Sequence, residues 1–304
     1  MNFSVTILGS GSALPTANRF PSAQLVSIHQ RHYLVDCGEG TQMQLFKYGL
    51  PMLKINHLFI SHLHIDHVLG VFGLIPTMSM MRREAPLHIY APPGMQQILD
   101  SHLSHFGEGM TYKVVAHELC CDRKDVILEE ERFSVASFPL KHRTPTCGFL
   151  FREKTLPRNI HKEAIEKYRL PVSAIVDIKN GGDLTLPNGE FVPNEKLTYP
   201  PPHSPRAYAY CSDTIACSEV VQEVRGVDLL YHEATFADDM CSFAIERGHS
   251  TALQAAQTAK EANAKMLVIG HFSSRYKSVD PLVTEARSVF KNTFAAEDGK
   301  SFEL

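Results

Sequence analysis

Three imidazoles and a carboxylate lie within six consecutive positions, just after the apolar run 58–60. The four side chains are His62, His64, Asp66 and His67, in the order His-x-His-x-Asp-His. Buried in a core, these donors would lack partners, whereas divalent cations would satisfy all of them. The alternation of the ligands suits two metal ions at once. The competing interpretation is a polar loop with coincidental histidines, and we favour the metal site.

His142, Asp213 and His271 each follow an apolar run that is typical of a buried strand. The three runs are 138–140, 208–210 and 267–270. Strand ends meet at one edge of a sheet, and open sheets bind their ligands there. We therefore expect these three side chains to converge with the histidine-rich segment on one crevice.

The elements that must position these residues alternate between strands and helices along the chain. Period-two and apolar runs predict strands at 1–8, 23–28, 32–35, 86–90, 132–140, 148–153, 208–210, 228–231 and 266–270. Helical periodicity predicts helices at 41–47, 68–82, 95–106, 218–224 and 251–264, the last capped by Ser250 or Thr251. The Met-rich segment 68–82 is expected to be one buried helix behind the site.

Composition limits the classes of protein that the chain can represent. Its 304 residues are 44% hydrophobic and 21% charged, which is typical of a globular protein with one large core or two packed halves. The chain begins without a signal-peptide pattern and has no apolar run long enough to span a bilayer, so we expect no membrane association. The formal net charge of −3 gives no bulk signature of nucleic-acid binding, so an RNA partner would need a local patch.

The seven cysteines are odd in number and scattered, and no two of them have a Cys-x-x-Cys spacing. A disulfide framework and a thiolate zinc finger are therefore not expected. This cysteine usage fits a reducing, cytoplasmic location.

Residues 154–200 differ in composition from the rest of the chain. Prolines and the turn dipeptides Gly181-Gly182 and Asn188-Gly189 recur, which indicates an insertion or arm rather than core. Basic and acidic residues are interleaved in it, so charge alone does not predict a phosphate-binding groove. A merely solvated arm remains the alternative.

The His62-x-His64-x-Asp66-His67 pattern, with a downstream His, Asp and His, resembles the metallo-β-lactamase superfamily. Further motifs make the chain similar to the ribonuclease Z family of tRNA 3′-processing endonucleases within it. These motifs are 36–42, 212–214, 232–236, 249–251 and 271–276, so the resemblance extends over nearly the whole chain. It implies an α/β fold, the four-layer αβ/βα metallo-β-lactamase sandwich, as a single domain over 1–304. Residues 154–200 would be an inserted tRNA-binding arm.

The resemblance also implies a role for each site residue. One zinc ion would be held by His62, His64 and His142, the other by Asp66, His67 and His271, and Asp213 would bridge both. Two zinc ions per subunit would clamp the attacking and leaving oxygens at phosphorus. The catalytic residues would be Asp66, which accepts the proton of the attacking water, His249, which protonates the leaving oxygen, and Glu233, which orients His249. The family further implies a homodimer acting on precursor tRNA.

Two segments depart from the family pattern. Many bacterial members have Pro-x-Lys-x-Arg-Asn in the loop associated with discriminating the CCA end, and this chain has Pro15-Thr16-Ala17-Asn18-Arg19-Phe20. The arm of the family usually carries a Gly-Pro pair after a Leu-Pro or Ile-Pro, whereas this chain has Leu170-Pro171-Val172-Ser173-Ala174. Arg275 and Tyr276 would touch RNA phosphate, or Arg275 would form a structural ion pair.

Two other functions remain open at this point. The first is a dizinc hydrolase of a small substrate such as a phosphodiester, cyclic nucleotide, sulfate ester or lactone. The second is a non-catalytic RNA-binding protein with a vestigial site. The complete ligand set argues against the second, and an arm that a small-molecule enzyme would not need argues against the first.

Overall fold

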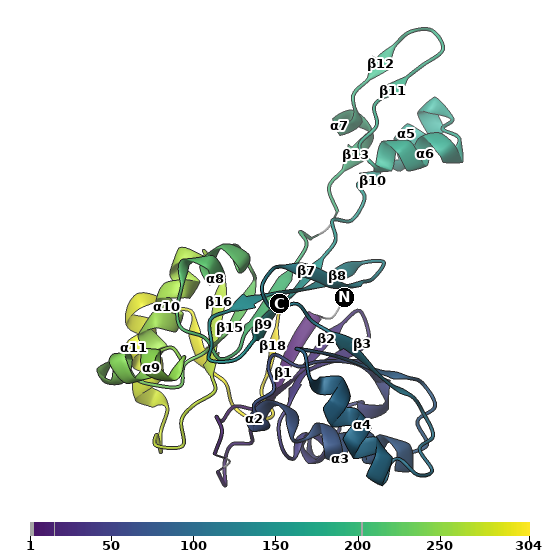
Figure 1. Cartoon of the computed structure of the whole chain (residues 1–304). Helices are drawn as coiled ribbons and strands as arrows, with labels where there is room; N and C mark the ends of the chain where they lie inside the picture. Colours follow the sequence, from purple (N-terminus) through teal and green to yellow (C-terminus); the bar gives the residue numbers. More distant parts are fainter. Residues whose placement is uncertain (1–2, 15, 202) are drawn as a thin grey trace. The chain divides into compact units, whose positions relative to one another are not determined.

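The computed structural model describes residues 3–14, 16–201 and 203–304, so Pro15 of the altered loop lies outside the described residues (Figure 1). The chain forms two compact units. The first comprises Met1–Glu129, Val135–Phe151 and Ala207–Leu304, and the second comprises Glu130–Ser134 and Arg152–Arg206. None of the described helices is both long and apolar enough to cross a membrane.

The first sheet of the larger unit is mixed. Its strand order is β18 (Ser301–Glu303), β1 (Phe3–Gly9), β2 (Ala23–Ile28), β3 (Arg31–Cys37), β4 (Ile55–Phe59), β5 (Leu87–Ala91) and β6 (Val114–Glu118). Pairing is antiparallel from β18 to β3 and parallel from β3 to β6. Helices α1 (Thr41–Lys47), α3 (Val71–Met80) and α4 (Met95–Phe106) bury Leu45, Leu74 and Leu99 against one face of this sheet. The apolar side chains of the strands and helices thus form one continuous core.

The second sheet carries its helices on its own outer face. Its order is β17 (Thr293–Ala295), β16 (Met266–Gly270), β15 (Leu229–Glu233), β14 (Ala207–Cys211), β9 (Thr146–Glu153), β8 (Phe133–Leu140) and β7 (Asp125–Glu129). Helices α8 (Ser218–Glu223), α9 (Cys241–Arg247), α10 (Ala252–Glu261) and α11 (Asp280–Val289) follow these strands, and α10 packs on β15 and β16. The segments η1 (Met52–Lys54) and η2 (Asp238–Met240) are short 3₁₀ helices.

The two sheets face each other through aromatic side chains. Phe59 of β4 meets Phe149 of β9 with ring centroids 5.5 Å apart, and both rings are fully buried. The layers of this unit are therefore helix, sheet, sheet and helix, and the predicted α/β sandwich is confirmed.

The helix predicted over 68–82 is present as α3 (Val71–Met80), but it begins three residues later than predicted, because the chain breaks after α2 (Ile65–Val68). The break lies at Leu69–Gly70, where the Gly70 amide donates to Cys37 O at 2.9 Å. A side chain at Gly70 would collide with Gly38 O, so this close approach of two backbones requires glycine. As a result α2 begins inside the histidine-rich segment and presents Asp66 and His67 from a helical turn.

Several elements of the larger unit fall outside the predicted set, namely β6, β7, β17, β18, α9 and α11, as do the short helices and strands within residues 154–200. Helix α10 is predicted correctly, and Thr251 forms a capping box with Gln254 at its start.

Cys121 and Cys147 are joined by a disulfide, although the cysteine pattern predicts no disulfide framework. Spacing could not indicate this bond, since it depends on the tertiary placement of the strand that carries Cys147.

The smaller unit has a core of its own. It contains α5 (Lys162–Tyr168), α6 (Val172–Lys179), α7 (Asn194–Leu197) and two antiparallel strand pairs, β10 (Asn159–Ile160) with β13 (Thr198–Tyr199) and β11 (Leu184–Thr185) with β12 (Phe191–Val192). Ala164, Leu170, Ile178, Val192 and Leu197 form its buried cluster. Asn194 ties its elements together by donating to Ile178 O and Gly182 O, each at 2.7 Å.

Candidate metal centre and active site

Asp36, at the end of β3, anchors the segment that follows β4. Its Oδ1 accepts from the Ser61 amide at 2.7 Å, and its Oδ2 accepts from the Ser61 hydroxyl at 2.9 Å and the Tyr210 hydroxyl at 2.6 Å. The same Oδ2 accepts from His67 Nδ1–H at 2.7 Å. Asp36 holds these contacts in a left-handed backbone conformation with φ 54°. One fully buried carboxylate thus fixes both ends of the ligand segment.

Four donors form the first candidate metal group. His64 Nδ1 lies 2.9 Å from His62 Nε2 and 3.4 Å from His142 Nε2. Asp213 Oδ2 lies 3.5 Å from His62 Nε2 and 3.8 Å from His142 Nε2. The segment after β4, the loop after β8 and the loop after β14 therefore contribute to one group.

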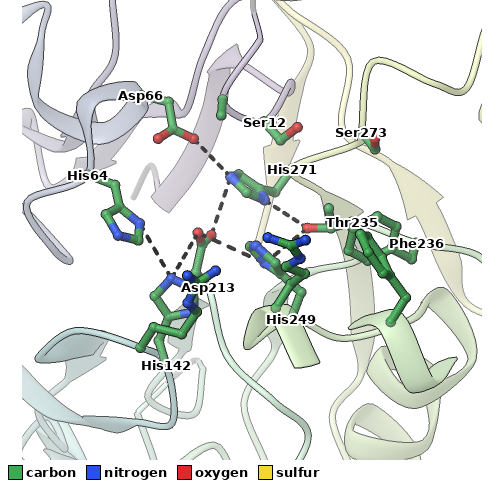
Figure 2. A pocket seen from close by; sticks show the side chains of 14 residues that line it. Ser12, His64, Asp66, His142, Asp213, Thr235, Phe236, His249, His271 and Ser273 are labelled. Atoms are coloured by element: carbon green, nitrogen blue, oxygen red, sulfur yellow. Dashed lines mark hydrogen bonds and ion pairs between the residues drawn. The ribbon is translucent and has the colours of Figure 1, made fainter. Parts of the chain in front are cut away.

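The second candidate group lies on the other side of Asp213. Asp66 Oδ2 lies 3.5 Å from His67 Nε2 and 3.3 Å from His271 Nε2. Asp213 Oδ1 lies 3.6 Å from His67 Nε2 and 3.3 Å from His271 Nε2. Asp213 thus directs one oxygen at each group, which is the geometry of a bridging carboxylate (Figure 2). All seven sequence-predicted ligands are brought together.

Four of the five histidines have their outward nitrogen fixed by a protein group. His62 Nδ1 lies 3.1 Å from Ser61 Oγ, and His67 Nδ1 is held by Asp36. His142 Nδ1–H donates to Gly248 O at 2.7 Å, and His271 Nδ1–H donates to Thr235 Oγ1 at 2.9 Å. Each contact leaves Nε2 directed inward, as second partners of metal-binding histidines do.

The donor spacing fits divalent metal ions. A tetrahedral ion with bonds of about 2.0–2.1 Å separates its ligands by about 3.3 Å, and the donor distances here lie between 2.9 and 3.8 Å. Among the described residues, His67 Nε2 and Asp213 Oδ1 are buried without a hydrogen-bond partner. Imidazole nitrogens with carboxylate oxygens are the donor set that zinc accepts.

The buried negative charges of the site also favour the binding of cations. Burial opposes the charge on His67, but Asp66, Asp36 and Asp213 outweigh it and raise the pKa of this imidazole well above its usual range. Burial likewise opposes the charge on Asp213, yet the surrounding histidines hold its pKa low. Buried carboxylates at this density need positive partners, and bound metal ions would supply the charge that protonated histidines otherwise supply.

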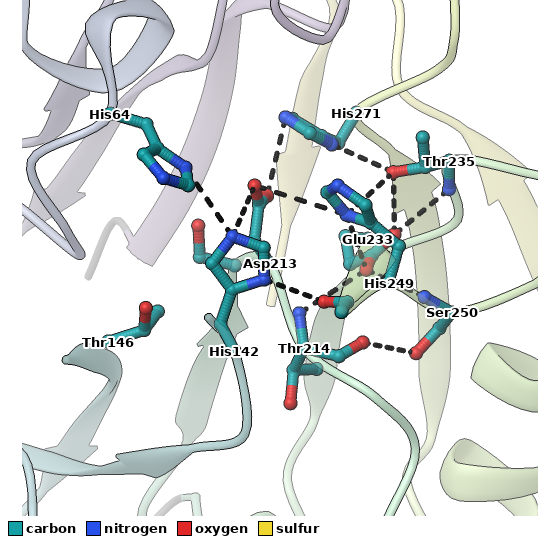
Figure 3. Close-up of polar contacts among 12 residues, drawn as sticks. His64, His142, Thr146, Asp213, Thr214, Glu233, Thr235, His249, Ser250 and His271 are labelled. Atoms are coloured by element: carbon teal, nitrogen blue, oxygen red, sulfur yellow. Dashed lines mark hydrogen bonds and ion pairs between the residues drawn. The ribbon is translucent and has the colours of Figure 1, made fainter. Parts of the chain in front are cut away.

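His249 and Glu233 form a pair beside the metal groups (Figure 3). Glu233 Oε1 accepts from His249 Nδ1–H at 3.1 Å and from the Ser250 amide at 2.7 Å, and Oε2 accepts from the Thr235 amide and hydroxyl at 2.9 and 2.8 Å. Burial lowers the pKa of His249, but the charge and hydrogen bond of Glu233 outweigh it and raise the pKa to about 9. Glu233 therefore favours the protonated form of the His249 imidazole.

An open pocket of about 300 Å³ exposes the site to solvent. Its floor includes His64, Asp66, Asp213, His249 and His271 (Figure 2). Its wall includes Ser12, Arg143, Phe236, Phe243, Arg247 and Ser273. The pocket can hold a small phosphodiester at the metal groups, with guanidinium groups available for further negative charge.

The sequence pattern does not indicate the supporting role of Gly248. Gly248, with φ 78°, offers its carbonyl to His142, and a Cβ there would lie 2.7 Å from His142 Nδ1. A glycine at the end of a helix is the only local signal for this role. His271 itself has φ 59°, a conformation that is rare for a side chain of this size and that occurs at functional sites.

The residues near the altered loop also have partners. Arg19 lies over the ring of Phe272 at 5.5 Å, and Phe272 directly follows the predicted ligand His271. The Tyr276 hydroxyl accepts from the Ala237 amide at 2.8 Å. Arg275 is exposed and has no carboxylate within ion-pair distance among the described residues, so the structural ion pair is absent there.

Comparisons with known proteins extend over the whole chain. The chain is 46% identical over 302 residues to a ribonuclease Z of Bacteroides fragilis and 44% identical to that of Porphyromonas gingivalis, with 99% of each chain covered. The crystal structure of the short form of human tRNase Z aligns with a TM-score of 0.71, 28% identity and 98% of each chain covered. The family model described as Anti-Pycsar protein Apyc1 matches residues 3–156.

Proposed function

The chain belongs to the ribonuclease Z family, and from this membership we propose that its seven histidine and aspartate ligands hold two zinc ions per subunit. The enzyme is a metal-dependent hydrolase, an endoribonuclease that processes the 3′ end of precursor tRNA. Residues 3–156 also belong to the family of the Apyc1 model, and this half contains five of the seven ligands, His62, His64, Asp66, His67 and His142. The remaining ligands and the His249–Glu233 pair lie in the second half.

The proposed ligands divide into two groups that share Asp213. His62, His64 and His142 would hold one zinc ion, and Asp66, His67 and His271 would hold the other. The mutual spacing of the donors and the inward nitrogens of the histidines support this division. When bound, the two ions supply Lewis-acid stabilisation of the phosphoryl oxygens and lower the pKa of water.

Asp66 is the proposed acceptor of the proton from the attacking water. Its side chain lines the pocket, and its pKa is held below the usual range, because His67 and His271 outweigh the effect of burial. A carboxylate that stays ionised can accept a proton in the transition state and release it afterwards. Attack at phosphorus would break the bond to the 3′-oxygen and leave a 3′-hydroxyl on the tRNA.

His249 is the proposed proton donor to that leaving oxygen. It lines the pocket, lies 3.9 Å from Asp213 Oδ2 and is held by Glu233 in its protonated form. Glu233 is a positioning residue, because it is fully buried and touches the reaction only through His249 and Thr235. The leaving alkoxide would receive the proton from the nitrogen that does not face Glu233.

We propose that the arm, residues 154–200, is an exosite for tRNA. It lies within the smaller unit, whose separate core supports a preformed module. A pocket lined by Arg158 and Lys179 offers cationic groups, with the Arg158 amide bound to Lys179 O at 3.0 Å. Substrates as long as tRNA can use such a second contact, whereas a small phosphodiester cannot.

We further propose a homodimer in the cytoplasm. Met43 and Phe46 on α1 are 63% and 57% exposed, and Ile65 on α2 is 64% exposed, which supports a partner that covers apolar side chains. Phe46→Glu should then convert the dimer to a monomer in sedimentation velocity experiments. An unchanged sedimentation coefficient would remove this surface from the proposal.

The position of Asp213 between two complete donor groups is the main observation in support of the proposed dizinc endoribonuclease. The test incubates zinc-replete protein with labelled precursor tRNA that bears a 3′ trailer, beside an Asp66→Ala variant and beside tRNA that ends in CCA. Cleavage after the discriminator nucleotide, absent in the variant, supports the assignment, and the CCA substrate reports on the altered loop at 15–20. Turnover of a chromogenic phosphodiester without cleavage of precursor tRNA would favour a small-substrate hydrolase instead.

A further inference from the structure

One wall of the active-site pocket combines aromatic rings with guanidinium groups. Phe236 follows β15, and its ring lies 5.9 Å from that of His249 at an interplanar angle of 72°. Phe243, on α9, meets Phe236 edge to face with centroids 5.4 Å apart at 84°. Phe236 is 5% exposed, whereas Phe243 is only half-buried. Phe243 is therefore the ring of this pair that a ligand can reach.

Two arginines border the same rings. Arg247 Cζ lies 5.0 Å from the Phe243 centroid. Arg275 Cζ lies 5.5 Å from the Phe243 centroid and 4.9 Å from that of Phe236. Both guanidinium groups are on exposed residues, and cations in this position are attracted to the ring faces. The two rings are thus bordered by two exposed guanidinium groups.

These cations are not neutralised by protein carboxylates. Arg275 donates to Ser273 Oγ and Met240 Sδ, neither of which carries charge. The closest carboxylate oxygen to Arg247 is that of Glu246 at 3.9 Å, at the limit of an ion pair. Arg143 lies in the loop between β8 and β9 and forms no ion pair within the part of the chain that the structure describes. The wall therefore offers a flat apolar surface and positive charge together, which matches a base and its phosphates.

We propose that Phe243, bordered by Arg247 and Arg275, stacks the base of the nucleotide whose 3′-oxygen leaves. The inference rests on the proposed function, in which His249 protonates that oxygen. The Phe236 ring contacts both His249 and Phe243. The base of the nucleotide that carries the leaving 3′-oxygen is therefore the part of the substrate that Phe243 can reach. Arg247 and Arg275 would turn from the ring toward the flanking phosphates. Phe243 is then a specificity-determining residue that aligns the cleaved bond with the metal groups.

The test combines a protein variant with a substrate variant. Precursor tRNA is prepared intact, with an abasic ribose on the 5′ side of the cleaved bond, or with an abasic ribose on its 3′ side. Each substrate is cleaved by wild type, Phe243→Ala, Phe243→Trp and Phe106→Ala, the last being a 69% exposed phenylalanine on α4 that serves as a matched control. The zinc content of each protein is measured in parallel.

Phe243→Ala should lower kcat/KM on intact precursor tRNA by about 5- to 150-fold, the range that corresponds to the ~1–3 kcal/mol of one base–aromatic stack. The 5′ abasic ribose should cost wild type the same factor and cost Phe243→Ala nothing more. The 3′ abasic substrate should retain the full difference between the two proteins. Phe243→Trp should restore cleavage, and Phe106→Ala should behave as wild type.

Additive losses for Phe243→Ala and the 5′ abasic ribose would overturn the inference, as would full activity of Phe243→Ala on intact substrate. Loss of zinc from Phe243→Ala would assign the residue to support of the metal groups and would also overturn it. Failure of wild type to cleave intact precursor tRNA would instead remove the proposed function, and the inference with it. The two failures are therefore distinguishable.

Discussion

Replacing His249 with alanine separates proton donation from metal binding. The imidazole has one strong partner, Glu233 at 3.1 Å, and a weaker contact with Thr235 Oγ1 at 3.3 Å. After the substitution the Glu233 carboxylate still accepts from the Thr214 and Ser250 amides and from the Thr235 amide and hydroxyl. The lost hydrogen bond to a charged group costs about 1.5–3 kcal/mol of folding free energy, so the variant should remain folded.

The effect on turnover should be much larger than the effect on folding. A positioned general acid contributes a factor of about 10²–10⁴, which corresponds to ~2.7–5.4 kcal/mol in the activation barrier. His249→Ala should lower the single-turnover rate on precursor tRNA by this factor. Its zinc content should stay at the wild-type level, because neither proposed ligand group uses His249.

A change of leaving group tests whether the loss of activity in His249→Ala comes from the loss of proton donation. A bridging 3′-sulfur at the cleaved bond leaves as a thiolate and needs no proton, so His249→Ala should cleave this substrate within a few-fold of wild type. His105→Ala, a substitution of an exposed histidine on α4, serves as the control and should match wild type on both substrates. Equal losses on the oxygen and sulfur substrates would refute proton donation. Loss of zinc would instead make His249 a ligand, together with Asp213 and His271.

The same pair predicts the pH dependence. Glu233 raises the pKa of His249 to about 9, above the reference value for histidine. The stabilisation from this proton is complete below the unfolded-state pKa of about 6.5 and is lost as pH rises through about 9. Bound cations lower the pKa of the imidazole, so the alkaline limb of the wild-type rate should lie below pH 9 and should be absent in His249→Ala. An alkaline limb that persists in the variant would assign it to another group.

Further substitutions test the remaining parts of the site and fold. Gly248→Ala should lower zinc content and activity together, because the new Cβ would lie 2.7 Å from His142 Nδ1, and elemental analysis beside a phosphodiesterase assay measures both. Glu233→Gln should move the alkaline limb of the rate to lower pH while leaving zinc bound, since it removes the charge that holds the proton, and a pH–rate profile checks this. Deleting residues 160–195 should raise KM for precursor tRNA far more than for a small phosphodiester, and equal losses would contradict an exosite. Reducing the disulfide of Cys121, with a sequence separation of 26, should lower stability by ~3.5 kcal/mol in denaturant titrations.

The ligand segment could be predicted from sequence because its chemistry is local. His62, His64, Asp66 and His67 lie within six positions, and polar residues after apolar runs indicated Asp213 and His271 in the correct relation to strands. No tertiary contact was needed to recognise either pattern.

Other features depend on the approach of distant backbones. The helix expected over 68–82 begins only at Val71, because Gly70 meets the backbone of Gly38 just before it, a contact that periodicity cannot reveal. Gly248 and Thr235 orient His142 and His271 across the fold, and neither lies in a metal-ligand pattern. Phe243 lies on α9, a helix too short to give a clear periodic signal.

The buried carboxylates of the site fall into two groups with different positive partners. Asp66 and Asp213 face the candidate metal groups, whereas Glu233 faces His249. Asp66 and Asp213 direct oxygens at the inward histidine nitrogens, where metal ions would neutralise them. Glu233 is equally buried, but its oxygens are occupied by backbone amides, a hydroxyl and His249, so it is unavailable as a ligand. A carboxylate that is fully hydrogen-bonded to protein donors favours the protonated form of His249, which the proposed pair of divalent cations would otherwise disfavour. In the proposed mechanism, this separation would let one pocket activate water on one side of the phosphorus and protonate the leaving oxygen on the other.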